Sequence, residues 1–246
     1  MRKSHIIILV ILIALLGVFF YFFDKPGAKT DNVAQNGSQN PVLDIAPLVT
    51  EHASSTYAEM QIIAPKSDSG HLPEIFALIQ DAKNDFWGRY GNLTAKQAKD
   101  MYIRDNNQYQ MYADTKIATS SKTVSYIIQI YQYTGGAHGG TSVNTFTYDK
   151  TGTLVTADDV FQPGYLSVIA PMSKKYFYDT FGEYAQPQMI DAGTEATTTN
   201  YSSWYLTDDS VVFIFGQYQV GPYALGIQEY PIAKSAIQAI LKPAFR

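Results

Sequence analysis

The feature that most constrains this chain is an alternating run that ends in a glycine-rich connection. Residues 124–133 read VSYIIQIYQY, and residues 133–141 continue as YTGGAHGGT. Apolar side chains at every second position share one face, which is typical of a half-buried β-strand. The segment 141–149, TSVNTFTYD, alternates as well and is the expected neighbour of this strand. The sequence therefore predicts a sheet that contains two strands joined by glycines.

Segments on either side of this pair mix helical and strand patterns without a regular order. Residues 57–65 predict a strand, and residues 72–90 predict an amphipathic helix. Thr94 is expected to cap a short second helix. Further on, residues 165–181 carry a helical stripe and residues 202–220 predict a β-hairpin. Because strands and helices do not alternate regularly, we expect an α+β fold in which antiparallel β-sheet packs with a few helices.

The amino-terminal end predicts one transmembrane helix before this fold. Residues 6–23, IIILVILIALLGVFFYFF, carry no charge, and as a helix they span about 27 Å, close to the hydrocarbon thickness of a bilayer. Arg2 and Lys3 favour a cytoplasmic position for the tail before it. A cleaved signal peptide is the alternative, although no small-residue cleavage site follows Phe23. We expect a single-pass protein of the cell membrane whose carboxyl-terminal region is extracytoplasmic.

Four regions are expected along the chain. They are a signal-anchor at 1–23, a flexible linker at 24–45, a first α+β domain at 46–114 and a second α+β domain at 115–246. The linker is expected because its stretch is rich in Gly, Asn, Gln, Pro and Ser and has little apolar surface to bury.

Charge and cysteine content exclude several classes of function. The chain has 18 Lys and Arg against 22 Asp and Glu, a net charge of −4, and it has no long basic stretch. Nucleic-acid binding needs clustered cations, so no nucleic-acid partner is expected. Cysteine is absent, which removes thiol nucleophiles, thiolate zinc sites and disulfides.

The glycine-rich connection has several chemical interpretations. A phosphate-binding loop of the Walker type needs a Lys-Ser/Thr pair that opens a helix, and TGGAHGGTSVNTF has no lysine. The histidines outside the anchor, His52, His71 and His138, show no metal-binding spacing, so neither a cofactor nor a metal ion is expected. The remaining interpretations are a structural one, in which glycines adopt positive φ or allow close packing while His138 bonds within the loop, and a ligand-binding one.

Catalysis at this histidine needs a partner. An enzyme is the alternative function, with His138 and Asp149, or another carboxylate brought close by folding, as the acid–base pair. Whether His138 faces inward or outward decides between these interpretations, and the sequence leaves that question open.

Two ordered blocks resemble a known family. YQYTGGAHGGTSVNTFTYDKTGTLVTADDVF resembles the signature of the RsiV/PdaC-type extracytoplasmic domains, found at the carboxyl end of an anti-sigma factor and in the non-catalytic region of a peptidoglycan deacetylase. Its later positions are matched in order by Asp149, Gly152, Asp159 and Phe161. FIFGQYQVGPYALGIQEYPI is similar to the family's late block. The motif positions across both blocks are Tyr133, Thr134, Gly135, Gly136, His138, Gly139, Tyr218, Pro222, Tyr223 and Gly226.

The resemblance implies a function in the cell envelope. It makes 46–114 a PdaC-like domain and 115–246 an RsiV-like domain, although the first match is weak. It implies a membrane-anchored binding or sensing module for peptidoglycan or for a wall-directed protein such as lysozyme. The deacetylase catalytic domain and the sigma-binding region of the relatives have no counterpart here, so neither activity is carried over. The alternative function is a cell-wall glycan hydrolase or deacetylase that uses His138 with a nearby carboxylate. Clustered tyrosines, with Trp87 and Trp204, are suited to stacking on sugar faces, although most aromatics are expected in the core.

Overall fold

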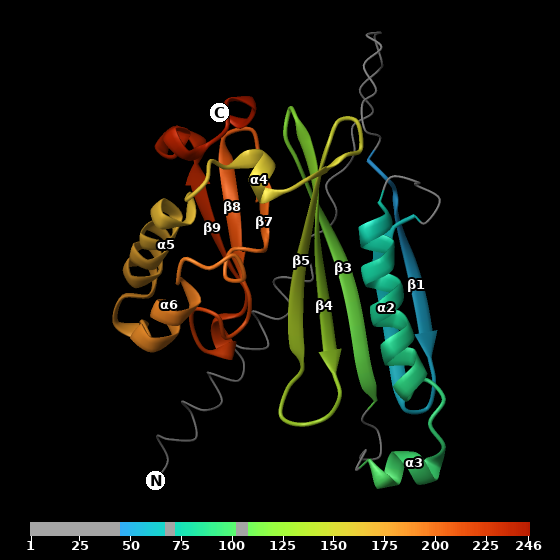
Figure 1. Cartoon of the computed structure of the whole chain (residues 1–246). Helices are drawn as coiled ribbons and strands as arrows, with labels where there is room; N and C mark the ends of the chain where they lie inside the picture. Colours follow the sequence, from blue (N-terminus) through green and yellow to red (C-terminus); the bar gives the residue numbers. More distant parts are fainter. Residues whose placement is uncertain (1–44, 67–71, 102–107) are drawn as a thin grey trace, which may run out of the picture. The chain divides into compact units, whose positions relative to one another are not determined.

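The computed structural model describes residues 45–66, 72–101 and 108–246 (Figure 1). The expected transmembrane segment 6–23 and the expected linker up to residue 44 lie outside these residues. Within the part of the chain that the structure describes, no helix is long and apolar enough to cross a membrane. The segment Pro41–Arg246 forms one compact unit.

A six-stranded sheet contains the two strands predicted around the glycines (Figure 1). Its strands, in sequence order and in spatial order, are β1 (Leu48–Ser54), β2 (Ala58–Pro65), β3 (Tyr109–Thr119), β4 (Thr123–Tyr133), β5 (Gly140–Asp149) and β6 (Leu154–Val155). Neighbouring strands are antiparallel except β2 and β3, which are parallel. The predicted α+β class is therefore confirmed. The sheet was expected to be antiparallel, but it is mixed, because β2 and β3 run parallel.

The parallel pair follows from the two helices that lie between its strands in the sequence. These helices are α2 (Pro73–Tyr90) and α3 (Ala95–Asp100). A connection of this length carries the chain back along the sheet, so β3 starts at the same end as β2. The expected cap of α3 is present, because the Thr94 hydroxyl accepts a hydrogen bond of 3.3 Å from the backbone N–H of Gln97.

The helix α2 packs on one face of the six-stranded sheet. Its buried residues, which share a core with the strands, are Ile75, Ile79 and Phe86. Near the start of the helix, the hydroxyl of Tyr148 in β5 donates a hydrogen bond of 2.9 Å to Glu74. Near its end, the ring of Tyr90 lies 4.3 Å from the ring of Tyr109 in β3. The helix thus packs mainly over β2 and β3, and only the Tyr148 side chain links it to β5.

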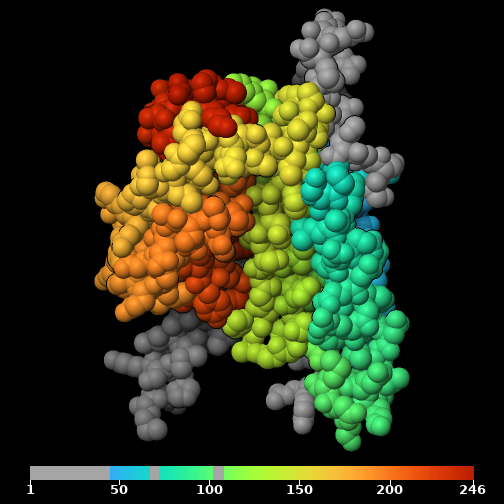
Figure 2. All heavy atoms as spheres, in the orientation of Figure 1, coloured from blue at the N-terminus to red at the C-terminus, as the bar shows by residue number. Residues whose placement is uncertain are grey.

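A three-stranded antiparallel sheet packs on the opposite face. Its strands are β7 (Trp204–Leu206), β8 (Ser210–Phe215) and β9 (Gln228–Ala233). The two sheets meet through a small apolar cluster of Ile127, Tyr205, Val212 and Ile214. The outer face of the smaller sheet is covered by α5 (Leu166–Phe181) and α6 (Pro187–Gly193). In Figure 2 the chain after residue 155 and the helix α2 lie on opposite sides of the β4–β5 pair.

The remaining elements are short. They are α4 (Ala157–Val160) and five 3₁₀ turns, Gly182–Tyr184, Tyr223–Leu225, Lys234–Ala236, Gln238–Ile240 and Pro243–Phe245. The expected boundary between residues 114 and 115 falls inside β3. The two larger apolar cores divide the chain later, because the first uses residues up to Tyr148 and the second begins at Val155.

Candidate functional site at the glycine-rich end of the sheet

The connection between β4 and β5 depends on its glycines. Gly135 and Gly136 have φ values of +95° and +97°, which favour glycine. A Cβ atom on Gly139 would lie 2.6 Å from the carbonyl oxygen of Gln132 and would also overlap the ring of Tyr131. Both structural uses of glycine that the sequence suggested, positive φ and close packing, therefore occur in this connection.

His138 faces outward and is held on three sides. Its Nδ1 lies 2.8 Å from the carbonyl oxygen of Gly139, and its Nε2 lies 3.1 Å from the hydroxyl of Tyr218. Its ring stacks on Tyr223 with 4.0 Å between centroids. A carbonyl oxygen only accepts, so Nδ1 carries the proton of the neutral ring and Nε2 accepts the hydrogen of the Tyr218 hydroxyl.

Tyr218 has a strained backbone. Its φ is +64°, and it is the one non-glycine residue with positive φ among residues 45–66, 72–101 and 108–246. Both neighbours anchor it. The side-chain oxygen of Gln217 accepts a hydrogen bond of 2.9 Å from the backbone N–H of Thr141. The side-chain amide of Gln219 donates to the carbonyl oxygens of Gly193 and Asn200 at 3.1 and 2.9 Å. The surrounding structure thus imposes this conformation, which is typical of functional positions.

The two sequence blocks therefore meet in space. His138 from the first block contacts Tyr218 and Tyr223 from the second, 80 and 85 residues later in the chain. The other motif residues support this contact. Tyr133 donates a hydrogen bond of 3.1 Å to the carbonyl oxygen of Gly136, and Pro222 and Gly226 bound the turn that carries Tyr223. Thr134 is exposed beside them.

Asp149 lies at the other end of β5. Its distance from Gly140, at the start of the strand, is nine residue steps, or about 30 Å along an extended strand. Its Oδ1 accepts hydrogen bonds from the N–H and hydroxyl of Thr151, at 2.8 and 2.6 Å, and from the N–H of Thr153 at 3.0 Å. The structure therefore does not bring Asp149 and His138 together as an acid–base pair, because a full strand separates them.

The pKa of Asp149 reflects this local turn. Burial alone raises the pKa of its carboxyl, but the hydrogen bonds from Thr151, Thr153 and Gly152 together outweigh burial, so the pKa lies below its usual value of 3.8. At the glycine-rich end, burial raises the pKa of the Tyr131 hydroxyl, and the neighbouring Tyr223 raises it further.

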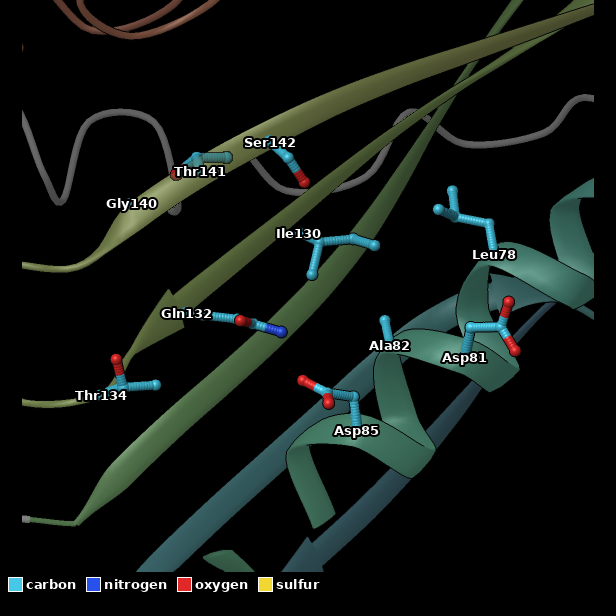
Figure 3. A pocket seen from close by; sticks show the side chains of 10 residues that line it. All are labelled: Leu78, Asp81, Ala82, Asp85, Ile130, Gln132, Thr134, Gly140, Thr141 and Ser142. Atoms are coloured by element: carbon cyan, nitrogen blue, oxygen red, sulfur yellow. The ribbon is translucent and has the colours of Figure 1, made fainter. Parts of the chain in front are cut away.

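An open groove of about 710 Å³ lies between α2 and the glycine-rich end of the sheet (Figure 3). Its helix wall is formed by Leu78, Asp81, Ala82 and Asp85, and its strand wall by Ile130, Gln132, Thr134, Gly140, Thr141 and Ser142. The groove exists because α2 packs on β2 and β3 and leaves this end of β4 and β5 beside it uncovered. We call this site the α2–hairpin groove.

Part of this groove was predicted from the sequence, and the rest was not. Thr134 belongs to the predicted motif, but Asp81 and Asp85 were not singled out. The sequence does contain a pattern that indicates this wall. Its residues follow the spacing i, i+3, i+4, i+7 of one helical face and include two carboxylates one turn apart. Within the described residues, no group of three or more His, Cys, Asp or Glu side chains is arranged to hold a metal ion.

Comparison with known proteins gives two family matches. Residues 33–141 match the model of the family "Deacetylase PdaC", and residues 158–235 match DUF3298, a family of unknown function. These matches confirm the predicted resemblance. The first match contains all groove residues except Ser142, whereas the second contains Tyr218 and Tyr223. The contacts of His138 therefore join the two matched regions.

Individual relatives agree with these matches. The chain is 26% identical over 249 residues to peptidoglycan-N-acetylmuramic acid deacetylase PdaC of Bacillus subtilis, covering 98% of this chain and 50% of that protein. It is 30% identical over 142 residues to esterase Rv3036c of Mycobacterium tuberculosis, covering 55% of this chain and 61% of the esterase. The chain thus spans about half the length of PdaC.

Solved structures share the fold. A DUF3298 family member from Bacteroides fragilis superposes with a TM-score of 0.58 and 17% identity, covering 79% of this chain and 92% of that one. A DUF3298 protein from Pseudomonas aeruginosa gives a TM-score of 0.52 and 16% identity, covering 82% of this chain and 98% of that one. At this level of identity, the similarity concerns the fold alone.

Proposed function

Because the chain carries a PdaC-type region followed by a DUF3298-type region, we propose that it is an extracytoplasmic binding module of the cell envelope that binds the glycan strands of peptidoglycan. The observation that carries this proposal is the α2–hairpin groove. Its volume lies within the range of about 300–1,000 Å³ typical of small-ligand sites, and it is open to solvent, so a polymer has access.

The side chains of the groove suit a sugar. Gln132, Thr134 and Ser142 offer amide and hydroxyl groups that both donate and accept, which matches the hydroxyl groups of a saccharide. Leu78 and Ala82 add a small apolar surface next to them. All of these residues lie on or next to a packed helix or strand of the scaffold, so little ordering is needed on binding.

The relatives support a wall-related role without extending their activity to this chain. PdaC of Bacillus subtilis is named for peptidoglycan N-acetylmuramic acid, and the groove lies within the part of this chain that is similar to it. The PdaC family match, residues 33–141, contains all groove residues except Ser142. The chain spans half of that protein, so deacetylase activity is not part of the proposal. A membrane anchor is part of it, supported by the uncharged run 6–23.

Catalysis through His138 and Asp149 is not proposed. Both ring nitrogens of His138 already have partners, and Asp149 lies at the far end of β5. General acid–base chemistry needs the two groups within hydrogen-bond reach of one substrate.

Binding to peptidoglycan tests the proposal. The purified full chain is incubated with insoluble peptidoglycan, and its affinity for soluble glycan fragments is measured by calorimetry. The variant Ser142→Tyr places a ring in the groove, and we expect it to weaken glycan binding at least about tenfold. Thr50→Tyr is the matched control, because Thr50 is an exposed strand position of the same sheet, in β1. The proposal is overturned if the chain does not bind, or if Ser142→Tyr binds as tightly as the natural chain. Binding of a lysozyme-like protein without glycan binding also contradicts it.

A further inference from the structure

We infer that the α2–hairpin groove prefers glycans with free amino groups over the same glycans in N-acetylated form. This inference rests on the proposed glycan binding and concerns the charge of the sugar that the groove selects. Its basis is the combination of a cavity of about 710 Å³ with a lining that holds two carboxylates and no cationic side chain.

The helix wall supplies the negative charge. Asp81 and Asp85 are exposed and both line the groove, and Figure 3 shows the Asp85 carboxylate directed toward the strand wall. They are four residues apart on one helix, a spacing at which like charges repel. A counter-charge near each carboxylate relieves this repulsion, and a ligand can supply it where the helix does not.

Neither of the two cationic side chains of α2 neutralises the charge of the Asp81 carboxylate. Arg89 pairs with Asp85, at 2.7 Å between the guanidinium and the carboxylate. Lys83 pairs with Glu51 of β1. Among the residues that the structure describes, none forms an ion pair with Asp81. Its carboxylate is therefore available to a ligand.

The strand wall leaves room beside these carboxylates. In the register of β4 and β5, Gln132 lies opposite Gly140 and Ile130 lies opposite Ser142. Gly140 has no side chain, so space remains next to the Gln132 amide. A sugar whose ring hydroxyls bond to Gln132 and Ser142 would present its substituents to the helix wall.

The amino group and the acetamido group then differ in their interaction with Asp81. A protonated amine donates a charge-assisted hydrogen bond to the carboxylate, which is stronger than a neutral one. An N-acetyl group is neutral, and its methyl would remove water from the carboxylates without replacing it. Sugars of the 2-amino-2-deoxy type are therefore the expected ligands.

Matched oligosaccharides test this inference. The affinity of the full chain is measured by calorimetry for tetramers of glucosamine and of N-acetylglucosamine at low salt. We expect the glucosamine tetramer to bind about tenfold more tightly, and Asp81→Asn to abolish the difference. Asp179→Asn is the matched control, because Asp179 is an exposed carboxylate on α5, far from the groove lining. It should keep the preference. Tetralysine tests whether charge alone is enough, and we expect it to bind more weakly than the glucosamine tetramer.

The outcomes separate the two proposals. If neither tetramer nor peptidoglycan fragments bind, the proposed function itself fails. If both tetramers bind equally, or the acetylated one binds more tightly, glycan binding stands and the preference for amines is overturned. The preference is also overturned if Asp81→Asn retains it or if Asp179→Asn loses it. Tetralysine that binds as tightly as the glucosamine tetramer, with the same dependence on Asp81, overturns the assignment to sugars.

Discussion

The two ends of β5 are held in opposite ways. At the Asp149 end, one carboxylate accepts hydrogen bonds from residues two and four positions later, so the turn is complete within five residues. At the Gly140 end, the connection is held by residues 76 and 80 positions away, through the bonds of Thr141 to Gln217 and of His138 to Tyr218. One end is a local turn, and the other is assembled from two distant parts of the chain.

This difference teaches where function is to be expected. A turn that satisfies its own polar groups leaves little for a ligand. A connection fixed from outside keeps its exposed groups oriented. At this end the exposed His138 ring contacts the strained Tyr218, and Thr134, Gly140 and Thr141 of the same connection line the groove.

The largest effect is expected from a methyl group at Gly139. In Gly139→Ala the new atom meets the Gln132 carbonyl and the Tyr131 ring, so the strand end must shift. We expect the free energy of unfolding to fall by about 2 to 3 kcal/mol, measured by urea denaturation. Gly140→Ala is the control, because no atom lies within 4 Å of its Cβ position. Equal stability of the two variants would contradict the close packing described for Gly139.

An intermediate effect is expected at the local turn. Asp149→Ala removes the acceptor of three hydrogen bonds, and we expect it to lower the free energy of unfolding by about 1 kcal/mol at pH 7. Because the folded pKa of Asp149 is lowered, its ionised carboxylate stabilises the fold above the usual pKa of 3.8, and this stabilisation is lost as pH falls further.

The loss of stability between pH 5 and pH 3 should therefore be smaller in Asp149→Ala than in the natural chain. Asp149→Asn serves as the control, because its amide keeps an oxygen acceptor but does not titrate. Urea denaturation at both pH values measures the difference, and an unchanged acid sensitivity in Asp149→Ala would exclude this carboxylate as a contributor.

The smallest effect on stability is expected at Tyr218. Tyr218→Phe removes an exposed hydrogen bond and keeps the ring, so the free energy of unfolding should change by less than about 0.5 kcal/mol. The nitrogen chemical shifts of His138 should nevertheless move, because Nε2 loses its donor. Tyr184→Phe, at a side chain that is 75% exposed, is the control and should leave these shifts unchanged. Unchanged His138 shifts in Tyr218→Phe would mean that the bond is absent in solution.

The same contrast explains which parts of the structure could be predicted from the sequence. Strands 124–133 and 141–149 were predicted within one residue, because alternation is a local property. The Thr94 cap was predicted for the same reason. The parallel pairing of β2 with β3 was not, since it depends on where the chain returns after α2 and α3.

The candidate site also has parts that local sequence patterns predict and parts that depend on distant contacts. His138 and Tyr218 were both recognised as motif positions, but their contact joins residues 80 positions apart and has no periodic signature. The groove depends on which strands α2 packs against, and the helical pattern of 72–90 does not contain that information.

The pairing of β4 with β5 determines where the chain can be cut into fragments that fold. Ten residues of β4, from Thr123 to Gln132, pair with β5, while the PdaC match ends at residue 141, just after β5 begins. A fragment cut there would expose one whole side of β4 as a long apolar edge, which invites aggregation. β5 is also bonded to the region that follows residue 155. The Ser203 hydroxyl donates to the carbonyl oxygen of Val143, and the N–H of Trp204 donates to the hydroxyl of Thr145. The end of the family match is thus not a cutting point, and both matched regions have to be expressed together.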